Sequence, residues 1–320
     1  MRILLTGKNG QVGAELARFL PHLGAVVAFD RQQLDLSQPD HVRRAIREIR
    51  PQIIVNAAAY TAVDQAETDE TAARAINAEA PRIIAEEAKK IGAGVVHYST
   101  DYVFDGSKTS PYEEDDPPHP LSVYGRTKLA GEQAIRDAGV PHLIFRTAWV
   151  YGTRGRNFLL TILRLATQRE ELKIVHDQTG APTWSRAIAR ATTSILEQHC
   201  RSGPDALSLE PISGTYHMTA GGSTTWYEFA QAILEEAAQA PRDLPWLAAA
   251  TSGHPLLVRR IVPITTAEYP IPARRPAYSV LSNSRLGSRF GCQLPPWRAQ
   301  LHSAFRDGEL PPLIPADSNR

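Results

Sequence analysis

Residues 1–20 read MRILLTGKNGQVGAELARFL, and this stretch decides the fold. Residues 3–6 form a short apolar run typical of a buried strand, and residues 14–20 have the apolar spacing of a helix. The turn between them contains three glycines, Gly7, Gly10 and Gly13. Glycines permit a tight turn and let backbone amides approach a pyrophosphate at a helix N-terminus. The stretch therefore predicts a strand, a glycine turn and a helix that together bind a dinucleotide.

The same alternation continues through the first half of the chain. Apolar runs predict further strands at residues 25–29, 53–55, 94–98 and 142–146. Helical spacing predicts helices at residues 39–49 and 70–91. Strands that alternate with helices form parallel sheets covered on both faces. We therefore expect an α/β fold with a Rossmann-type, doubly wound parallel sheet.

The pattern becomes less regular beyond residue 150. Helices are expected at residues 157–167, 185–198 and 225–240, a surface loop at 201–214, and a loosely held tail at 311–320. We predict an NAD(P)-binding Rossmann domain at residues 1–150, joined by parts of 183–215. Residues 151–310 are then mainly a smaller α/β substrate-binding domain, interleaved with the first.

Composition excludes several classes of protein. The chain has 320 residues, 35 basic and 34 acidic, with a net charge of +1, so no nucleic-acid or membrane partner is expected. Cys200 and Cys292 have no CxxC spacing, which argues against a disulfide framework or a structural zinc. The N-terminal apolar run is too short for a signal peptide, and no apolar run approaches the roughly 20 residues of a membrane span. We expect a cytoplasmic protein.

Tyr124 and Lys128 form the most informative pair of side chains. Four positions apart, they lie on one face of a helix. A neighbouring ammonium lowers the pKa of a phenol from about 10, which makes the phenol a usable proton donor and acceptor near neutrality. The pair therefore predicts reduction of a carbonyl group.

A third member of the site is expected where the strand at residues 94–98 ends. Ser99 and Thr100 follow that strand, and the carboxyl ends of parallel strands face the ligand crevice. A hydroxyl there can hydrogen-bond the substrate carbonyl. On the residues alone, either Ser99 or Thr100 fills this role.

Asp30 and Arg31 leave the choice of coenzyme open. Asp30 closes the second strand, where a carboxylate can accept hydrogen bonds from the ribose hydroxyls of NADH. Arg31 follows directly, and a guanidinium there can receive the extra phosphate of NADPH. Asp35 is a second acidic candidate, for the adenine edge. The coenzyme is therefore predicted to be NADPH or NADH.

Seven sequence blocks resemble the extended short-chain dehydrogenase/reductase family, over nearly the whole chain. They are GKNGQVG (7–13), VNAAAYTAVD (55–64), HYSTDYVFDG (97–106), YGRTKL (124–129), RTAWVYG (146–152), DQTGAPT (177–183) and PARRP (272–276). Within the family, the chain is most similar to reductases of dTDP-4-keto-6-deoxy sugars. The resemblance implies reduction of the C4 keto group of dTDP-4-dehydro-6-deoxy-L-mannose to dTDP-L-rhamnose.

The resemblance also implies roles for individual residues. The catalytic trio is Thr100, Tyr124 and Lys128, which selects Thr100 over Ser99. Together with Arg31 from the argument above, the coenzyme contacts are Gly7, Gly10, Gln11, Val12, Gly13, Asp30, Arg31, Asp35, Leu36, Ala59, Tyr60, Thr61, Tyr98, Tyr124 and Lys128. The implied substrate contacts are Thr100, Asp101 and Trp149.

Arginines in two segments are candidates for the substrate diphosphate, because guanidinium forks suit it better than ammonium groups do. One set is Arg154 and Arg156 with the neighbouring Asn157, and the other is Arg274 and Arg275. We take Asn157 and Arg274 as the candidate ligands.

Some members of the resembled family are described as Mg²⁺-linked dimers that use two glutamates. Glu15 matches the first, but Arg186 lies where the second acid is expected. We therefore assign no metal and expect a monomer or a homodimer.

Two other functions share parts of this pattern. A nucleotide-sugar epimerase or dehydratase has the same glycine turn and the Tyr/Lys pair, although the Asp-Glu dipeptide common in dehydratases is absent after Thr100. A non-catalytic subunit resembling the regulatory partner of methionine adenosyltransferase would bind coenzyme without turnover. The complete Thr100, Tyr124 and Lys128 set favours an active reductase.

Overall fold

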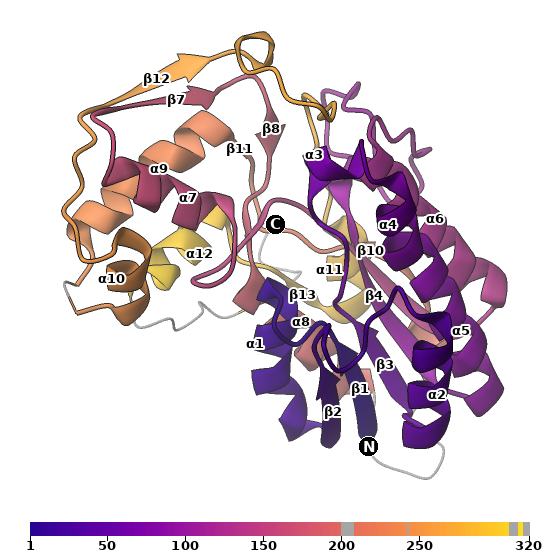
Figure 1. Cartoon of the computed structure of the whole chain (residues 1–320). Helices are drawn as coiled ribbons and strands as arrows, with labels where there is room; N and C mark the ends of the chain where they lie inside the picture. Colours follow the sequence, from indigo (N-terminus) through magenta and orange to yellow (C-terminus); the bar gives the residue numbers. More distant parts are fainter. Residues whose placement is uncertain (200–207, 242, 307–312, 316–320) are drawn as a thin grey trace.

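The protein is described by a computed structural model that covers residues 1–199, 208–241, 243–306 and 313–315. A six-stranded sheet with every strand parallel forms its centre (Figure 1). The strand order is β10-β5-β4-β3-β1-β2. The strands are β1 (Arg2–Thr6), β2 (Ala25–Phe29), β3 (Ile53–Asn56), β4 (Gly94–Thr100), β5 (His142–Thr147) and β10 (Gly214–His217). The predicted Rossmann-type α/β fold is confirmed.

Helices cover both faces of this sheet because its strands are apolar on both sides. In β1, Ile3 and Leu5 pack into the same core as Leu16, whereas Leu4 packs into a second core with Val42. The helices nearest the sheet are α1 (Gln11–Phe19), α2 (Pro39–Ile49), α3 (Val63–Ala66), α4 (Glu70–Arg74), α5 (Ala80–Ile91), α6 (Val123–Ala138), α8 (Ser185–His199) and α11 (Ser284–Phe290). Alternate side chains of each strand therefore face opposite layers.

The single helix predicted at residues 70–91 is interrupted. Between α4 and α5 lies a π-helical turn, η2 (Ala75–Glu79). Pro81 has no N–H, and its ring would clash with the carbonyl of Asn77 in a regular α-helix. The π turn takes the place of a regular α-helical turn directly before this proline, and such turns are frequent at functional sites.

The second half of the chain contributes one strand to the central sheet. β10 pairs with β5, in a part of the sequence for which no strand was predicted. Residues 201–207 of the predicted loop lie outside the described residues, and residues 208–213 contain the 3₁₀ turn η4 (Glu210–Ile212). Helix α8 also packs against α1. The division into a coenzyme domain and a substrate domain stays a prediction.

A smaller lobe lies beside the sheet (Figure 1). Its parallel strands β7 (Glu171–Val175) and β12 (Arg260–Ile264) pair with each other. The helices of the lobe are α7 (Phe158–Ala166), α9 (Trp226–Gln239), α10 (Pro245–Thr251) and α12 (Trp297–Ala304). Short paired strands are β6 (Val150–Tyr151) with β9 (Thr183–Trp184), β8 (Thr179–Gly180) with β11 (Thr224–Thr225), and β13 (Cys292–Gln293) with β14 (Ile314–Pro315). Three 3₁₀ turns complete the described chain, η1 (Leu20–His22), η3 (Asp101–Val103) and η5 (Thr266–Glu268).

The tail predicted at residues 311–320 falls mostly outside the described residues. Residues 311–312 and 316–320 lie outside the described residues, whereas Ile314–Pro315 pairs with Cys292–Gln293.

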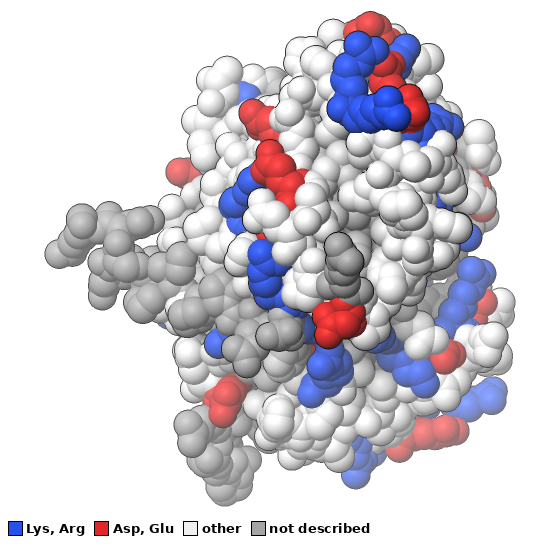
Figure 2. All heavy atoms as spheres, turned by 90° about the vertical axis from the view of Figure 1, so that its left-hand side faces the viewer, with Lys and Arg blue, Asp and Glu red and all other residues white. Residues whose placement is uncertain are grey.

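The described surface carries mixed charge. On the face shown in Figure 2, acidic and basic side chains alternate in small groups among uncharged residues. Within residues 1–199, 208–241, 243–306 and 313–315, no helix is both long enough and apolar enough to cross a membrane.

Candidate active site

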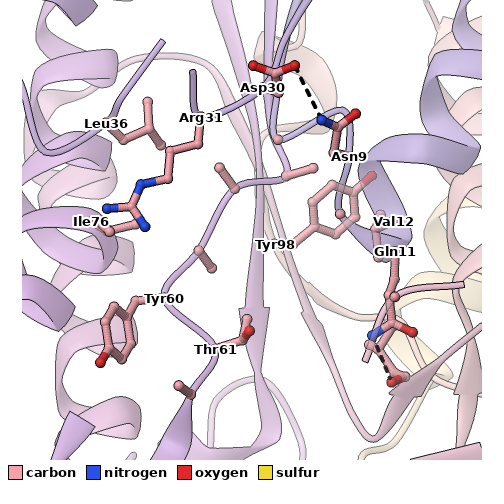
Figure 3. A pocket seen from close by; sticks show the side chains of 18 of the residues that line it. Asn9, Gln11, Val12, Asp30, Arg31, Leu36, Tyr60, Thr61, Ile76 and Tyr98 are labelled. Atoms are coloured by element: carbon pink, nitrogen blue, oxygen red, sulfur yellow. Dashed lines mark hydrogen bonds between the residues drawn. The ribbon is translucent and has the colours of Figure 1, made fainter. Parts of the chain in front are cut away.

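A cavity of about 1330 Å³ opens at the carboxyl ends of the central strands (Figure 3). Fourteen of the predicted coenzyme residues line it: Gly7, Gly10, Gln11, Val12, Asp30, Arg31, Asp35, Leu36, Ala59, Tyr60, Thr61, Tyr98, Tyr124 and Lys128. The structure therefore brings these residues together from five separate segments. The cavity lining also includes Ser99, but it does not include Gly13 or any of the five predicted substrate residues.

Close backbone contacts explain the glycines of the turn. Gly7 has φ +73°, and a Cβ there would lie 2.8 Å from the amide nitrogen of Ala58. A Cβ on Gly13 would lie 2.1 Å from the Gly7 carbonyl oxygen. Neither position can accept a side chain without movement of the backbone. Gly13 thus acts by allowing α1 to start directly against the turn.

The N-terminus of α1 is suited to an anion. Gly10 is its N-cap residue, no described side chain caps its first amides, and its first turn has no acidic residue. These amides carry the positive end of the helix dipole and point toward the turn. The arrangement fits a pyrophosphate group.

Asp30 is held in an ionised form at the end of β2. Its Oδ1 accepts hydrogen bonds from the amides of Gln32 (3.0 Å) and Gln33 (3.1 Å). The Nδ2 of Asn9 donates to Oδ2 at 3.3 Å, and Lys8 lies 3.6 Å away (Figure 3). The amide of Gln33 has the largest effect on the pKa of Asp30 and lowers it; burial opposes this, and the ammonium of Lys8 lowers the pKa further. The carboxylate is therefore charged beside the cavity.

Arg31 and Asp35 lie next to each other at the same rim. Their closest atoms are 3.9 Å apart, and the Arg31 side chain is 80% exposed. The amide of Ser37 lowers the pKa of Asp35. The Arg31 guanidinium extends into the cavity on the side of Leu36 (Figure 3). It is therefore free to contact a bound anion there.

Asn77 is a site residue that the sequence analysis missed. Its Oδ1 accepts the amide of Tyr60 at 2.9 Å, and its Nδ2 donates to the Tyr60 carbonyl at 3.1 Å. It also donates to Thr127 of α6, at 3.2 Å. Asn77 thus fixes the loop at Ala59, Tyr60 and Thr61 to α6. Its place four residues before Pro81 is the signal that could have identified it, because a regular helix cannot continue there.

Tyr124 keeps its proton in this structure. The pKa of its phenol is raised to about 12, mainly by burial; a hydrogen bond with Thr100 opposes this rise, and the nearby Asp101 adds a smaller increase. The expected lowering of the Tyr124 pKa by Lys128 is not seen. The reason is that burial dominates and that the Lys128 ammonium bonds elsewhere. The contact with Thr100, however, agrees with its predicted place beside Tyr124.

Lys128 is 2% exposed and is held by β4. Its Nζ donates to the Tyr98 carbonyl oxygen at 2.5 Å and lies 3.3 Å from His97 Nε2. Burial lowers the pKa of Lys128 to about 8, although Glu132 opposes this effect. His97 was not assigned a role from the sequence. A histidine within an otherwise apolar strand that ends at the site is the available signal.

Asp101 is a buried carboxyl group beside the predicted trio. Its Oδ1 accepts a hydrogen bond from Thr100 at 3.0 Å, and no described residue pairs with its Oδ2. Burial raises the pKa of Asp101 to about 7, against hydrogen bonds from Ser279 and Thr100. The group can therefore be either protonated or charged near neutral pH.

Trp149 lies at the edge of the smaller lobe in a strained backbone conformation, with φ +46°. Its ring stacks on Trp226, with centroids 3.5 Å apart and planes within 4°. A Cβ on Gly180 would lie 2.4 Å from the Trp149 ring. A strained residue this tightly packed is typical of a functional position. Trp226, its partner, was not predicted.

Asn157 contacts the glycine turn through Gln11. Its Nδ2 donates to Gln11 Oε1 at 2.8 Å and to the Gly152 carbonyl at 2.9 Å, and its Oδ1 caps α7. Direct contact with the substrate stays a prediction, but its present contacts position Gln11.

The two arginines near residue 275 differ. Arg275 forms two hydrogen bonds with Asp64, at 3.0 and 2.8 Å. Arg274 is exposed and forms no ion pair among the described residues. Arg274 is therefore the one available for a diphosphate.

Arg186 pairs with the glutamate that a metal would need. Its Nε lies 3.0 Å from Glu15 Oε2. In the part of the chain that the structure describes, no group of three or more histidines, cysteines or acids could hold a metal ion.

Comparison with known proteins decides the family. The family described as "RmlD substrate binding domain" matches residues 1–309. The chain belongs to this family. A relative from Burkholderia thailandensis, named dTDP-4-dehydrorhamnose reductase, is 50% identical over 307 residues, which cover 96% of this chain and 99% of the relative. A relative of the same name from Escherichia coli (strain K12) is 45% identical over 302 residues, which cover 93% and 95%.

A solved structure of an RmlD-type relative has the same fold. It is dTDP-4-dehydrorhamnose reductase from Bacillus anthracis in complex with NADP. It matches with a TM-score of 0.83 at 34% identity, over 95% of this chain and 98% of the other. The resemblance predicted from the sequence blocks is confirmed.

Proposed function

We propose that this protein is an oxidoreductase that reduces the C4 keto group of dTDP-4-dehydrorhamnose to give dTDP-L-rhamnose, with NADPH or NADH as the reductant. The observation that carries the proposal is one cavity lined by the glycine turn, Tyr124 and Lys128. Relatives named for this reaction match the chain over nearly its full length. The proposal places the enzyme in nucleotide-sugar synthesis, in the cytoplasm.

The donor set of the cavity fits a nicotinamide dinucleotide. The uncapped amides of α1 suit its pyrophosphate. The ionised Asp30 suits the adenosine ribose, and Arg31 suits a 2′-phosphate. The ammonium of Lys128 can bind the nicotinamide ribose hydroxyls. When bound, the reduced nicotinamide supplies a hydride to C4 of the sugar.

Tyr124 is proposed to supply the proton. Because its pKa is raised to about 12, the phenol is fully protonated at neutral pH. It can therefore donate to the alkoxide that forms at O4, which is the stronger base. Lys128 is proposed to act through the coenzyme ribose, since it does not lower the pKa of Tyr124 in the described structure. Its own lowered pKa, about 8, leaves it mainly charged at pH 7.

Thr100 and Asp101 are proposed to bind the substrate carbonyl side. The hydroxyl of Thr100 hydrogen-bonds Tyr124 and Asp101, so it lies between the proton donor and a buried acid. When this hydroxyl turns its one proton from Asp101 to the substrate, it can polarise the C4 carbonyl and fix its direction. Trp149 is proposed to shape the sugar pocket, and Arg274 to contact the diphosphate.

The proposal is tested by incubating the purified chain with dTDP-4-dehydrorhamnose and each coenzyme. Expected results are one coenzyme oxidised per sugar reduced, and a product with the L-rhamno configuration by proton NMR. Product formation without net coenzyme consumption would indicate an epimerase or a dehydratase. Coenzyme binding without turnover on several keto sugars would indicate a regulatory subunit. The oligomeric state, monomer or homodimer, is read from light scattering of the same sample.

A further inference from the structure

Four buried polar side chains form a continuous chain that ends at Lys128. The hydroxyl of Thr6 donates to Asn56 Oδ1 at 2.7 Å, and Asn56 Nδ2 lies 3.1 Å from His97 Nδ1. His97 Nε2 lies 3.3 Å from Lys128 Nζ. All four side chains are at most 2% exposed. The chain thus runs from the glycine turn, through the sheet, to the ammonium of the site.

Strand register aligns these residues. Thr6 is the partner of Asn56 across β1 and β3, and Asn56 is the partner of His97 across β3 and β4. The residue opposite His97 on the far side of β4 is Ile144, which is apolar. A buried polar group is tolerated only when another group pairs with it. Each member of this chain is therefore satisfied mainly by the next one.

Neutral groups, not carboxylates, hold Lys128. Glu132, one turn further along α6, bonds with both oxygens to Arg146, at 3.0 and 2.8 Å. No described carboxylate lies within ion-pair distance of Lys128. Tyr124 is the other titratable group near it on α6, and it stays protonated. The position of the ammonium therefore depends on His97 Nε2 and the Tyr98 carbonyl.

The hydrogen bonds that link Thr6, Asn56, His97 and Lys128 can run in either of two self-consistent directions. When Lys128 is an ammonium, it donates to His97 Nε2, so the proton of His97 lies on Nδ1 and faces an Asn56 oxygen. When Lys128 is a neutral amine, His97 Nε2–H donates to it, and His97 Nδ1 accepts from the Asn56 amide. The 3.1 Å contact between Asn56 Nδ2 and His97 Nδ1 corresponds to this second direction. The Asn56 amide exchanges the two by turning 180° without a change of shape. Each direction keeps His97 neutral, which its complete burial favours.

We propose that His97 is a positioning residue for the reaction. It holds the Lys128 ammonium in place, and its tautomer follows the charge of Lys128 through the chain that ends at Thr6. This inference rests on the proposed reductase function, since Lys128 is the residue it positions. Thr6 and Asn56 act through His97 and contact no reacting atom.

Two substitutions separate this role from simple packing. His97→Gln places an amide oxygen near the former Nε2 and keeps a partner for Lys128. His97→Asn places its amide near the former Nδ1 and keeps Asn56 paired. It leaves Lys128 without the partner that Nε2 supplied. Both variants shorten or reshape the same buried side chain, so each controls for the other's effect on stability, which is measured by thermal unfolding.

Steady-state kinetics provide the first readout. We expect His97→Asn to lower kcat by about 10- to 100-fold, as for a displaced catalytic group, and to shift the pH profile of kcat. His97→Gln should stay within about threefold of the wild type, with an unshifted profile. Equal losses in the two variants with unshifted profiles would overturn the proposal and leave His97 as a packing residue.

Nitrogen NMR of the imidazoles provides a second readout that needs no turnover. The His97 signals are assigned by their loss in His97→Gln. In the wild type, we expect His97 to remain neutral from pH 5 to pH 10 and to change from the Nδ1–H to the Nε2–H tautomer as Lys128 titrates. In Lys128→Met, we expect His97 to show one tautomer throughout this range. A fixed tautomer in the wild type would overturn the proposal. If the wild type reduces no keto sugar, the proposed function fails, but this NMR result still decides the coupling.

Discussion

Asp64 and Arg275 lie 211 positions apart in the sequence and form a two-point ion pair. Nη1 of Arg275 is 3.0 Å from Asp64 Oδ1, and Nη2 is 2.8 Å from Oδ2. Asp64 also accepts the amide of Ala273, at 3.2 Å. Arg275 hydrogen-bonds the phenol of Tyr102, whose ring packs edge-on against Tyr124, with centroids 6.0 Å apart. The pair thus fixes a late segment of the chain beside the proton donor.

Asp64→Asn should therefore reduce catalysis more than stability. Loss of a partly exposed ion pair lowers the free energy of unfolding by about 1 kcal/mol. Release of Arg275 loosens the packing around Tyr124, so kcat/KM for the keto sugar should fall by about tenfold. Glu171→Gln, which breaks the exposed pair with Arg260, is the matched control and should leave kcat/KM unchanged. Equal kinetic effects in both variants would remove any special role for Asp64.

Gly13→Ala should abolish coenzyme binding. The added Cβ would lie 2.1 Å from the Gly7 carbonyl, so the turn must open, and such overpacking destabilises by about 1–3 kcal/mol. Gly221→Ala is the control, since its Cβ would meet its nearest atom at 3.5 Å. Calorimetric titration with NADPH and NADH measures the effect. Wild-type affinity in Gly13→Ala would show that the turn does not contact the coenzyme.

Arg31→Ala should separate the two coenzymes. If Arg31 contacts the 2′-phosphate, kcat/KM for NADPH should fall by about tenfold or more, as expected for a lost charged hydrogen bond of about 1.5–3 kcal/mol. The value for NADH should change by less than about twofold, because NADH has no such phosphate. Parallel initial-rate measurements with both coenzymes give the ratio. An equal loss with both would place Arg31 outside the phosphate site.

Asp101→Asn should change how stability depends on pH. Burial raises the pKa of Asp101 to about 7 in the folded chain, against about 3.9 in an unfolded chain. Between these values the folded chain holds one more proton, so Asp101 makes the free energy of unfolding fall as pH rises from about 4 to about 7.

The measurement is urea unfolding across that pH range. The wild type should lose stability relative to Asp101→Asn by up to about 1.4 kcal/mol per pH unit, and the difference should level off above pH 7. Asp137→Asn, which changes an exposed carboxylate, should run parallel to the wild type. Parallel curves for Asp101→Asn as well would mean that Asp101 is not desolvated.

The sequence predicted the fold well because its signals are local. The strand, turn and helix at residues 1–20 and the later apolar runs each specify one βα unit, and short right-handed connections leave few ways to join them. β10 was missed because Gly214–His217 is only four residues long and pairs with a strand that is distant in sequence. Gly214, for example, is the partner of Leu143, 71 residues earlier. Pairing at that distance leaves no local pattern.

Fourteen of the fifteen predicted coenzyme residues line one cavity, whereas none of the five predicted substrate residues does, and the sequence did not predict what each side chain contacts. Tyr124 and Lys128 lie on one helical face as their spacing required, yet Lys128 bonds to His97 and Tyr98. The expected effect of Lys128 on the Tyr124 pKa is absent because burial, a property of the whole fold, outweighs it. Asn77 was missed for a similar reason, since it lies in a π turn directly before Pro81 and contacts residues distant in sequence.

Tyr124→Phe tests the central claim most directly. Single-turnover reactions are followed by coenzyme absorbance, with the variant saturated by coenzyme and mixed with dTDP-4-dehydrorhamnose. The account predicts nearly unchanged coenzyme affinity and a reduction rate lowered by roughly 100- to 10,000-fold, the loss expected when a general acid is removed. A rate near that of the wild type would contradict the assignment of Tyr124 as the proton donor.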